Sequence, residues 1–149
     1  MPRGLALLVA LAVGAAGGCG SDERPLPAAC TQGAAPILQA LRAAPGAVRL
    51  ADGTRLSDCV KRATTDAELQ SLGLMLTPLA ERLAAAADRS DASALELGYL
   101  VGAARRGGGT LGLQAELVRR LEQAAGLDGV APAHRSAYRR GLRAGEARG

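Results

Sequence analysis

The sequence predicts an all-α fold: a compact bundle of about five helices, with a small turn or hairpin near residues 48–57 and a disulfide. Three observations predict it. The chain has 149 residues, of which 48% are apolar, enough for one hydrophobic core but not for two comfortable domains. The apolar share is mostly Ala and Leu, with no Phe or Trp and a single Ile, whereas large sheets draw on Val, Ile and aromatic residues. Leucines also recur at helical spacing between breakers.

Residues 1–18 have the three-part layout of a secretory signal peptide. Met1–Arg3 give a short positive start, residues 5–13 (LALLVALAV) an apolar centre, and residues 14–18 a run of small side chains. Nine apolar residues at about 1.5 Å each cannot span about 30 Å of hydrocarbon. We therefore expect an export signal that is removed, and no permanent transmembrane helix at this position.

The segment Ala16-Gly17-Gly18-Cys19 resembles the lipobox of bacterial lipoproteins, with Ala16 where that family prefers Leu. The resemblance implies that Cys19 carries a diacylglycerol and becomes the first residue of the mature protein. Residues 19–33 would then be a flexible tether, and the protein would be extracytoplasmic, anchored to the cell membrane by two acyl chains, which hold stably. Two alternatives stay open: ordinary cleavage near residue 15 or 17, giving a soluble secreted protein, and an unprocessed cytoplasmic chain.

The whole chain also resembles small lipoproteins of GC-rich bacteria that have an Ala/Leu/Arg helical body, as its arginine usage shows: all but one of the 18 basic residues are arginine. This likeness implies a location and no activity. The cysteine count agrees with the location, because three cysteines in an exported protein leave one unpaired.

If Cys19 takes the lipid, Cys30 and Cys59 remain as a pair. A disulfide between them closes a loop of about 30 residues, worth roughly 3.5 kcal/mol in the chain-entropy model. The alternative is two buried free thiols. No Cys-x-x-Cys and no histidine at ligand spacing accompany them in the sequence, so we expect no metal and no cofactor.

Residues 34–146 are the predicted helical domain. Its first helix spans residues 36–44 and ends at the breaker pair Pro45-Gly46. The Asp52-Gly53 pair predicts a turn after it, in a short hairpin or in irregular structure. Alternatively, Ser57 caps a helical turn that carries Cys59.

Residues 66–87 show the clearest helical periodicity. Five leucines form one apolar stripe at spacings of three and four: Leu69, Leu72, Leu76, Leu79 and Leu83. Thr65 or Asp66 is a good N-cap, with Glu68 in the first turn. Pro78 predicts a kink in one long helix, with two shorter helices as the alternative.

Three further helices are predicted over residues 92–106, 111–126 and 132–148. Ser90 or Asp91 caps the first, in which Gly98 and Gly102 share a face and let a neighbouring backbone approach closely. The second repeats Leu113, Leu117 and Leu121 and stops at Gly126. The third begins at Pro132 and turns Ala137, Tyr138 and Leu142 inward. Short links predict mostly antiparallel neighbours.

No catalytic residue is predicted. His134 and Ser136 stand two positions apart, a spacing that points side chains away from each other on a helix, so we expect a surface histidine. Asp88 and Asp91 lie where helix caps are expected. The glycine-rich stretch Arg105–Gly112 lacks the ending of a P-loop and a preceding strand, so we expect an interhelical link rather than a phosphate cradle.

The net charge is +4, and from Arg105 onward nine arginines stand against four acidic residues. The candidate binding surface is on the last helix: Arg135, Arg139, Arg140 and Arg143. A solvated face, or one lying against anionic headgroups, is the alternative. We expect a non-enzymatic binding or structural module at the cell envelope, with an envelope protein as partner and no nucleic acid.

Two other functions have less support in the sequence. Residues 116–145 can be interpreted as helix, turn and basic helix, as in an intracellular DNA-binding regulator. The export signal and a connection longer than the usual turn argue against it. An enzyme acting on envelope polymers has no residue pattern in its favour.

Overall fold

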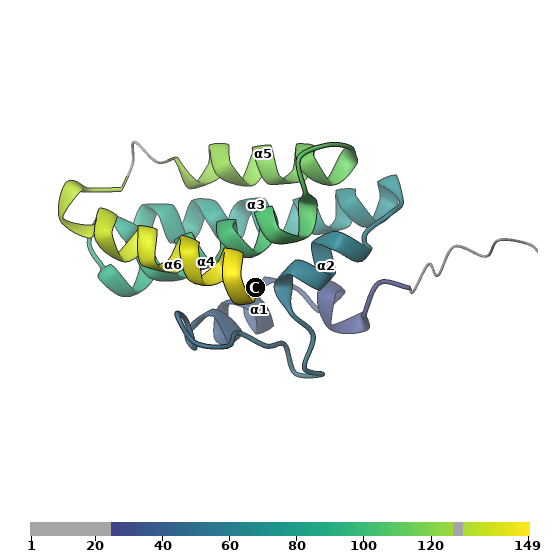
Figure 1. Cartoon of the computed structure of the whole chain (residues 1–149), viewed down its shortest axis with the longest axis horizontal. Coiled ribbons are helices and arrows are strands. Elements are labelled where there is room, and N and C mark those ends of the chain that lie inside the picture. Colours follow the sequence, from purple (N-terminus) through teal and green to yellow (C-terminus); the bar gives the residue numbers. More distant parts are fainter. Residues whose placement is uncertain (1–24, 127–129) are drawn as a thin grey trace, which may run out of the picture.

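The computed structural model describes residues 25–126 and 130–149 (Figure 1). The predicted signal peptide, Cys19 and the first part of the tether lie outside the described residues. Within the described ranges the chain forms six α-helices and two short 3-10 helices and has no strand. None of these helices is both long and apolar enough to cross a membrane. The all-α prediction is confirmed.

The N-terminal part of the described chain forms one side of the molecule. It contains η1 (Ala28–Thr31), α1 (Ala34–Leu41) and α2 (Leu56–Arg62). In Figure 1, α1 lies below the longer helices and α2 lies beside the C-terminal end of α6. Cys30 of η1 and Cys59 of α2 form the predicted disulfide, with a sulfur–sulfur distance of 2.01 Å. Both cysteines are buried.

The segment near residues 48–57 is a turn followed by a helix, not a hairpin. The Leu50 amide donates to the Thr54 carbonyl at 2.9 Å, and Asp52 Oδ1 accepts from the Thr54 amide at 2.9 Å. Gly53 has φ +83°, a conformation that favours glycine. A helix that carries Cys59 follows this turn, as the alternative predicted, but Ser57 does not cap it, and α2 raises the number of α-helices in the described residues to six. Its N-cap is Arg55; Ser57 is buried and donates its hydroxyl to the Gly149 carbonyl.

α3 (Asp66–Ala87) is one continuous helix. Thr65 caps it, because its Oγ1 accepts from the Glu68 amide at 3.3 Å and Glu68 Oε2 accepts from the Thr65 amide at 3.1 Å. All five leucines of the predicted stripe are buried. Pro78 lies within the helix on its exposed side. The prediction of one long helix is confirmed, and the alternative of two shorter helices is wrong.

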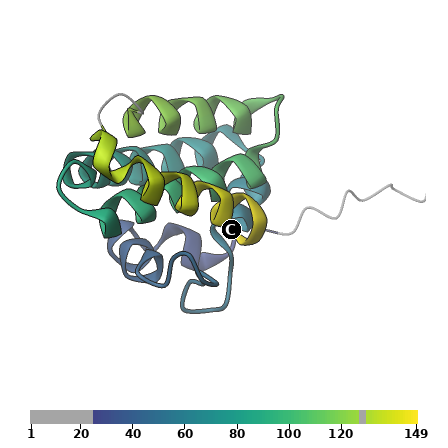
Figure 2. The same cartoon turned by 60° about the vertical axis from the view of Figure 1, so that its left-hand side comes forward.

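α4 (Asp91–Gly108) is the central helix of the bundle. It contacts α2, α3, α5 (Leu113–Ala125) and α6 (Arg135–Arg148), and η3 (Pro132–His134) leads into α6 (Figures 1 and 2). Because neighbours cover α4 on several sides, its middle is apolar nearly all round. The fully buried Tyr99 at its centre accepts a hydrogen bond from the Val48 amide at 3.4 Å, which ties the turn segment to the core.

Candidate functional site: the basic face of the C-terminal helix

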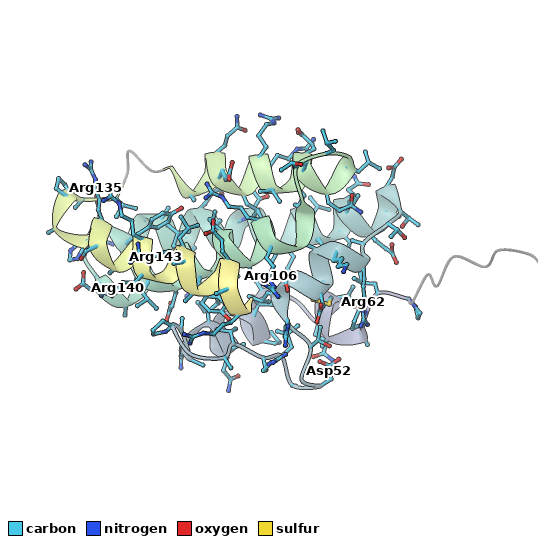
Figure 3. The ribbon with its side chains drawn as sticks, viewed as in Figure 1. Asp52, Arg62, Arg106, Arg135, Arg140 and Arg143 are labelled. Atoms are coloured by element: carbon cyan, nitrogen blue, oxygen red, sulfur yellow. A yellow bond between two sulfur atoms is a disulfide. The ribbon has the colours of Figure 1, made fainter. Side chains whose placement is uncertain are left out.

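α6 carries all four predicted surface arginines on its exposed side: Arg135, Arg139, Arg140 and Arg143. Arg135, Arg139 and Arg143 follow one another at intervals of four residues, and Arg140 precedes Arg143 by three. Residues three or four apart are neighbours on a helix surface, so the four arginines lie on one helical face. Figure 3 shows Arg135 at the start of α6 and Arg140 and Arg143 further along it. These four residues are called the basic face below.

The charges of the basic face are not compensated within the described part of the chain. No ion pair there includes any of the four arginines. Arg135 Nε donates to the Val130 carbonyl at 3.2 Å, and an Arg140 guanidinium nitrogen donates to Ser136 Oγ at 3.5 Å. Neither contact neutralises a guanidinium, so the face presents positive charge to solvent.

Glycines hold the opposite side of α6 against α4. A Cβ added to Gly98 or Gly102 would overlap the backbone of α6, at the carbonyls of Tyr138 and Leu142 respectively. The reverse also holds, since a Cβ at Gly141 or Gly145 would overlap the carbonyls of Leu95 and Tyr99. The predicted close approach at Gly98 and Gly102 is confirmed. Its counterpart on α6 was missed, although Gly141 and Gly145 show the same four-residue spacing in the sequence.

The C-terminal part of α6 is joined to its neighbours by charged groups. Arg105 of α4 bonds Glu122 of α5 at 2.6 Å and Glu146 of α6 at 3.2 Å. Burial opposes the charge of Arg105, but the two carboxylates outweigh it, so the pKa of Arg105 is raised. Arg106 donates to the Glu146 carbonyl at 2.9 Å. These contacts fix the position of α6 along the bundle.

The N-terminal end of α6 is joined to the start of α4. His134 Nδ1 lies 2.6 Å from Asp91 Oδ1, and Asp88 Oδ1 accepts from the Ala131 amide at 3.1 Å. Of the two residues predicted at helix caps, Asp88 occupies the C-cap position of α3, whereas Asp91 lies in the first turn of α4, which Ser90 caps by accepting from the Ser93 amide at 3.3 Å. The His134 side chain is only 23% exposed and paired, not a free surface histidine. A partner 43 residues away could not be found from local spacing.

The predicted link at Arg105–Gly112 is shorter than expected, because α4 continues to Gly108. A Cβ at Gly107 would overlap the Ser57 carbonyl, and one at Gly108 the Val118 side chain, so glycine here permits helix packing rather than chain flexibility. Arg105 and Arg106 are both bonded to α6, as described above.

The chemistry available at the basic face is recognition of anions. Guanidinium groups bind carboxylates and phosphates through paired, charge-assisted hydrogen bonds. No group of three His, Cys, Asp or Glu in the described ranges could hold a metal ion. The space beside the Cys30–Cys59 disulfide has a volume of about 10 Å³, room for about one water.

The arrangement of α5 and α6 differs from the helix, turn and basic helix that a DNA-binding regulator would form from residues 116–145. α5 and α6 both pack on α4, and the stretch between them, residues 126–134, includes η3.

Comparisons with models of protein families, with curated proteins and with solved structures find no match for this chain. Its function is therefore inferred from its own residues.

Proposed function

We propose that this protein is an extracytoplasmic lipoprotein, anchored to the cell membrane by lipid on Cys19, and that it binds an acidic envelope protein without catalysing a reaction. The observation that carries the proposal is the basic face. Four exposed arginines lie on one side of α6, free of ion pairs in the described ranges, while glycine contacts with α4 hold the other side. A rigid surface with uncompensated charge is suited to recognition.

The cysteines support export and lipidation. Disulfides persist in oxidising compartments and are rare in the bacterial cytosol. The Cys30–Cys59 disulfide uses two of the three cysteines, so the odd one is Cys19, which ends the segment that resembles a lipobox. Each cysteine then has a role that suits an exported chain.

The position of the basic face supports a protein partner rather than lipid headgroups. Cys19 precedes the first described residue, Pro25, by six residues, a length that reaches about 20 Å when fully extended. The domain would thus stay close to the membrane. The described chain begins at the end of the molecule opposite Arg135 (Figures 1 and 3). The start of the basic face is then directed away from the point of anchoring.

Fractionation of cells tests the anchor. We expect Cys19→Ala to move the protein from the membrane fraction to the soluble fraction, while Ser21→Ala, a change in the same tether, leaves it on the membrane. If the Cys19→Ala variant stayed in the membrane fraction, lipidation of Cys19 would be rejected. A fusion of residues 1–30 to alkaline phosphatase, which is active only after export, separates this proposal from an intracellular regulator.

Co-purification from solubilised membranes tests the basic face. The double variant Arg139→Glu, Arg140→Glu should lose a protein that co-purifies with the unmodified chain. Lys61→Glu, Arg82→Glu is the matched control, because both residues are exposed, lie on other helices and give the same change in net charge. Recovery of the same proteins with both double variants would reject a role for the basic face.

A further inference from the structure

A second surface, on the side formed by α3 and α5, has a different chemistry from the basic face. The two helices run side by side, with Leu117 next to Gly73 (Figure 1). Between them lies an open groove of about 910 Å³. Its lining extends along α3 from Asp66 to Glu81 and along α5 from Leu113 to Ala124.

The groove exposes apolar side chains that a soluble surface normally covers. Leu74 is 73% exposed and Leu113 is 55% exposed, and both line the groove. Leu111, at 86%, is exposed nearby but does not line it. Large apolar side chains gathered at a groove indicate a binding surface rather than ordinary scatter.

Negative charge marks the two ends of the groove. Asp66 and Glu81 line it and take part in no ion pair within the described ranges. They are fifteen residues apart on α3, about 22 Å at 1.5 Å per residue. Glu116 also lines the groove, but Arg119 and Arg120 bond it at 2.8 and 2.9 Å and hold its pKa at about 2. Arg120 lines the groove as well, and its charge offsets that of Glu116. Asp66 and Glu81 therefore keep their negative charge at the ends, with Leu74 between them on α3.

Pro78 leaves a backbone carbonyl, that of Leu74, as a hydrogen-bond acceptor in the middle of the groove. Proline has no N–H, so the carbonyl of Leu74, four residues earlier, cannot accept the usual helical hydrogen bond from residue 78. Both residues line the groove. Carboxylates at the ends and a carbonyl at the centre call for an occupant that carries donors and positive charge.

We propose that the α3–α5 groove binds an amphipathic helix of a partner protein, with an apolar stripe against Leu74 and Leu113 and a lysine or arginine near each end, opposite Asp66 and Glu81. Helices commonly dock in this way, with apolar anchors at intervals of three and four residues. The groove accommodates about four helical turns. Its acidic ends disfavour an anionic lipid surface, since like charges would meet there. The proposal does not depend on the role of the basic face.

Binding of two synthetic peptides to the purified protein tests the proposal by fluorescence anisotropy. Both are helical, about 18 residues long, and share one leucine stripe; one carries lysine near each end and the other glutamate. We expect the lysine peptide to bind at least about tenfold more tightly. The Asp66→Asn, Glu81→Gln variant should remove that preference. Asp58→Asn is the matched control, because Asp58 also lies in the first turn of a helix but outside the groove.

The apolar part is tested at exposed positions, where substitution leaves the core intact. Leu74→Ser should weaken binding of the lysine peptide about tenfold, whereas Leu111→Ser should leave the affinity unchanged. The thermal midpoints of both variants should stay the same as that of the unmodified protein. Equal binding of the two peptides, or equal weakening by the two serine variants, would overturn the proposal. It would also be overturned if Leu74→Ser abolished a dimer of the protein alone in sedimentation, or binding to phosphatidylglycerol vesicles, because the occupant would then be a second copy or a lipid surface.

Discussion

The substitution Gly98→Ala tests whether glycine sets the distance between α4 and α6. A Cβ at this position would overlap the Tyr138 carbonyl and lie 2.8 Å from the Leu142 amide nitrogen. These neighbours are backbone atoms, which cannot rotate away as a flexible side chain can. α6 would have to move as a unit, and the basic face would move with it.

The magnitude follows from two opposing terms. Alanine is favoured over glycine inside a helix by about 1 kcal/mol. Overpacking a filled contact costs about 1 to 3 kcal/mol, and a rigid backbone neighbour places this site at the upper end. We therefore expect Gly98→Ala to lower the free energy of unfolding by about 2 kcal/mol, and the thermal midpoint by about 8 °C for a protein of this size.

Gly73→Ala is the matched control, because it makes the same change inside another helix of this chain. The added Cβ would lie 3.6 Å from Leu117 Cδ1, an ordinary van der Waals distance. Only the helix-propensity term then applies, so we expect this variant to be more stable by about 1 kcal/mol. Urea unfolding followed by circular dichroism measures both. If Gly98→Ala is as stable as the unmodified protein, or if the two variants shift equally, close backbone packing does not determine the position of α6.

Three further predictions concern the disulfide, acid stability and the core. Replacing both Cys30 and Cys59 by alanine should lower the free energy of unfolding in non-reducing urea titrations by about 3.5 kcal/mol, and a much smaller loss would show that the closed loop constrains the unfolded chain little. Glu116 has its pKa lowered from 4.5 to about 2 by Arg119 and Arg120, so its pairing stabilises the fold above about pH 4.5 and the contribution is lost as pH falls through about 2. Glu116→Gln should therefore flatten the decline of the thermal midpoint over that range, and an unchanged decline would contradict the pairing. Tyr99→Phe removes the acceptor of the buried Val48 amide, so it should cost about 1 to 2 kcal/mol in chemical unfolding, whereas a neutral effect would mean that the amide finds another partner.

The positions of the long helices could be predicted because their signals are local. The leucines of α3 repeat every three or four residues, and Thr65 with Glu68 forms its cap within one turn. Both features arise from neighbours in sequence, which the hydrogen-bonding pattern of a helix brings together. α2 could not be predicted firmly, since seven residues give too short a pattern and its burial against α4 stabilises it.

For the candidate binding surface too, local spacing predicts one part and the fold decides the other. The spacing of the four arginines of α6 predicts a common face, because i and i+4 positions always share one. Their freedom from ion pairs in the described ranges depends on which acidic residues the fold brings near. Lipidation of Cys19 lies outside the described residues and stays a prediction.

The sequence by itself determined the helical class and the bounds of most helices to within a few residues, and it favoured the pairing of Cys30 with Cys59 that the structure contains. Only the tertiary structure decided that Gly141 and Gly145 of α6 face the backbone of α4, that His134 pairs with Asp91, and that Leu74 and Leu113 flank one groove. The physical reason is the separation in sequence of the residues that interact. A helix is specified by interactions across three or four residues, whereas these contacts join residues about 40 apart, and their formation depends on how the whole core packs.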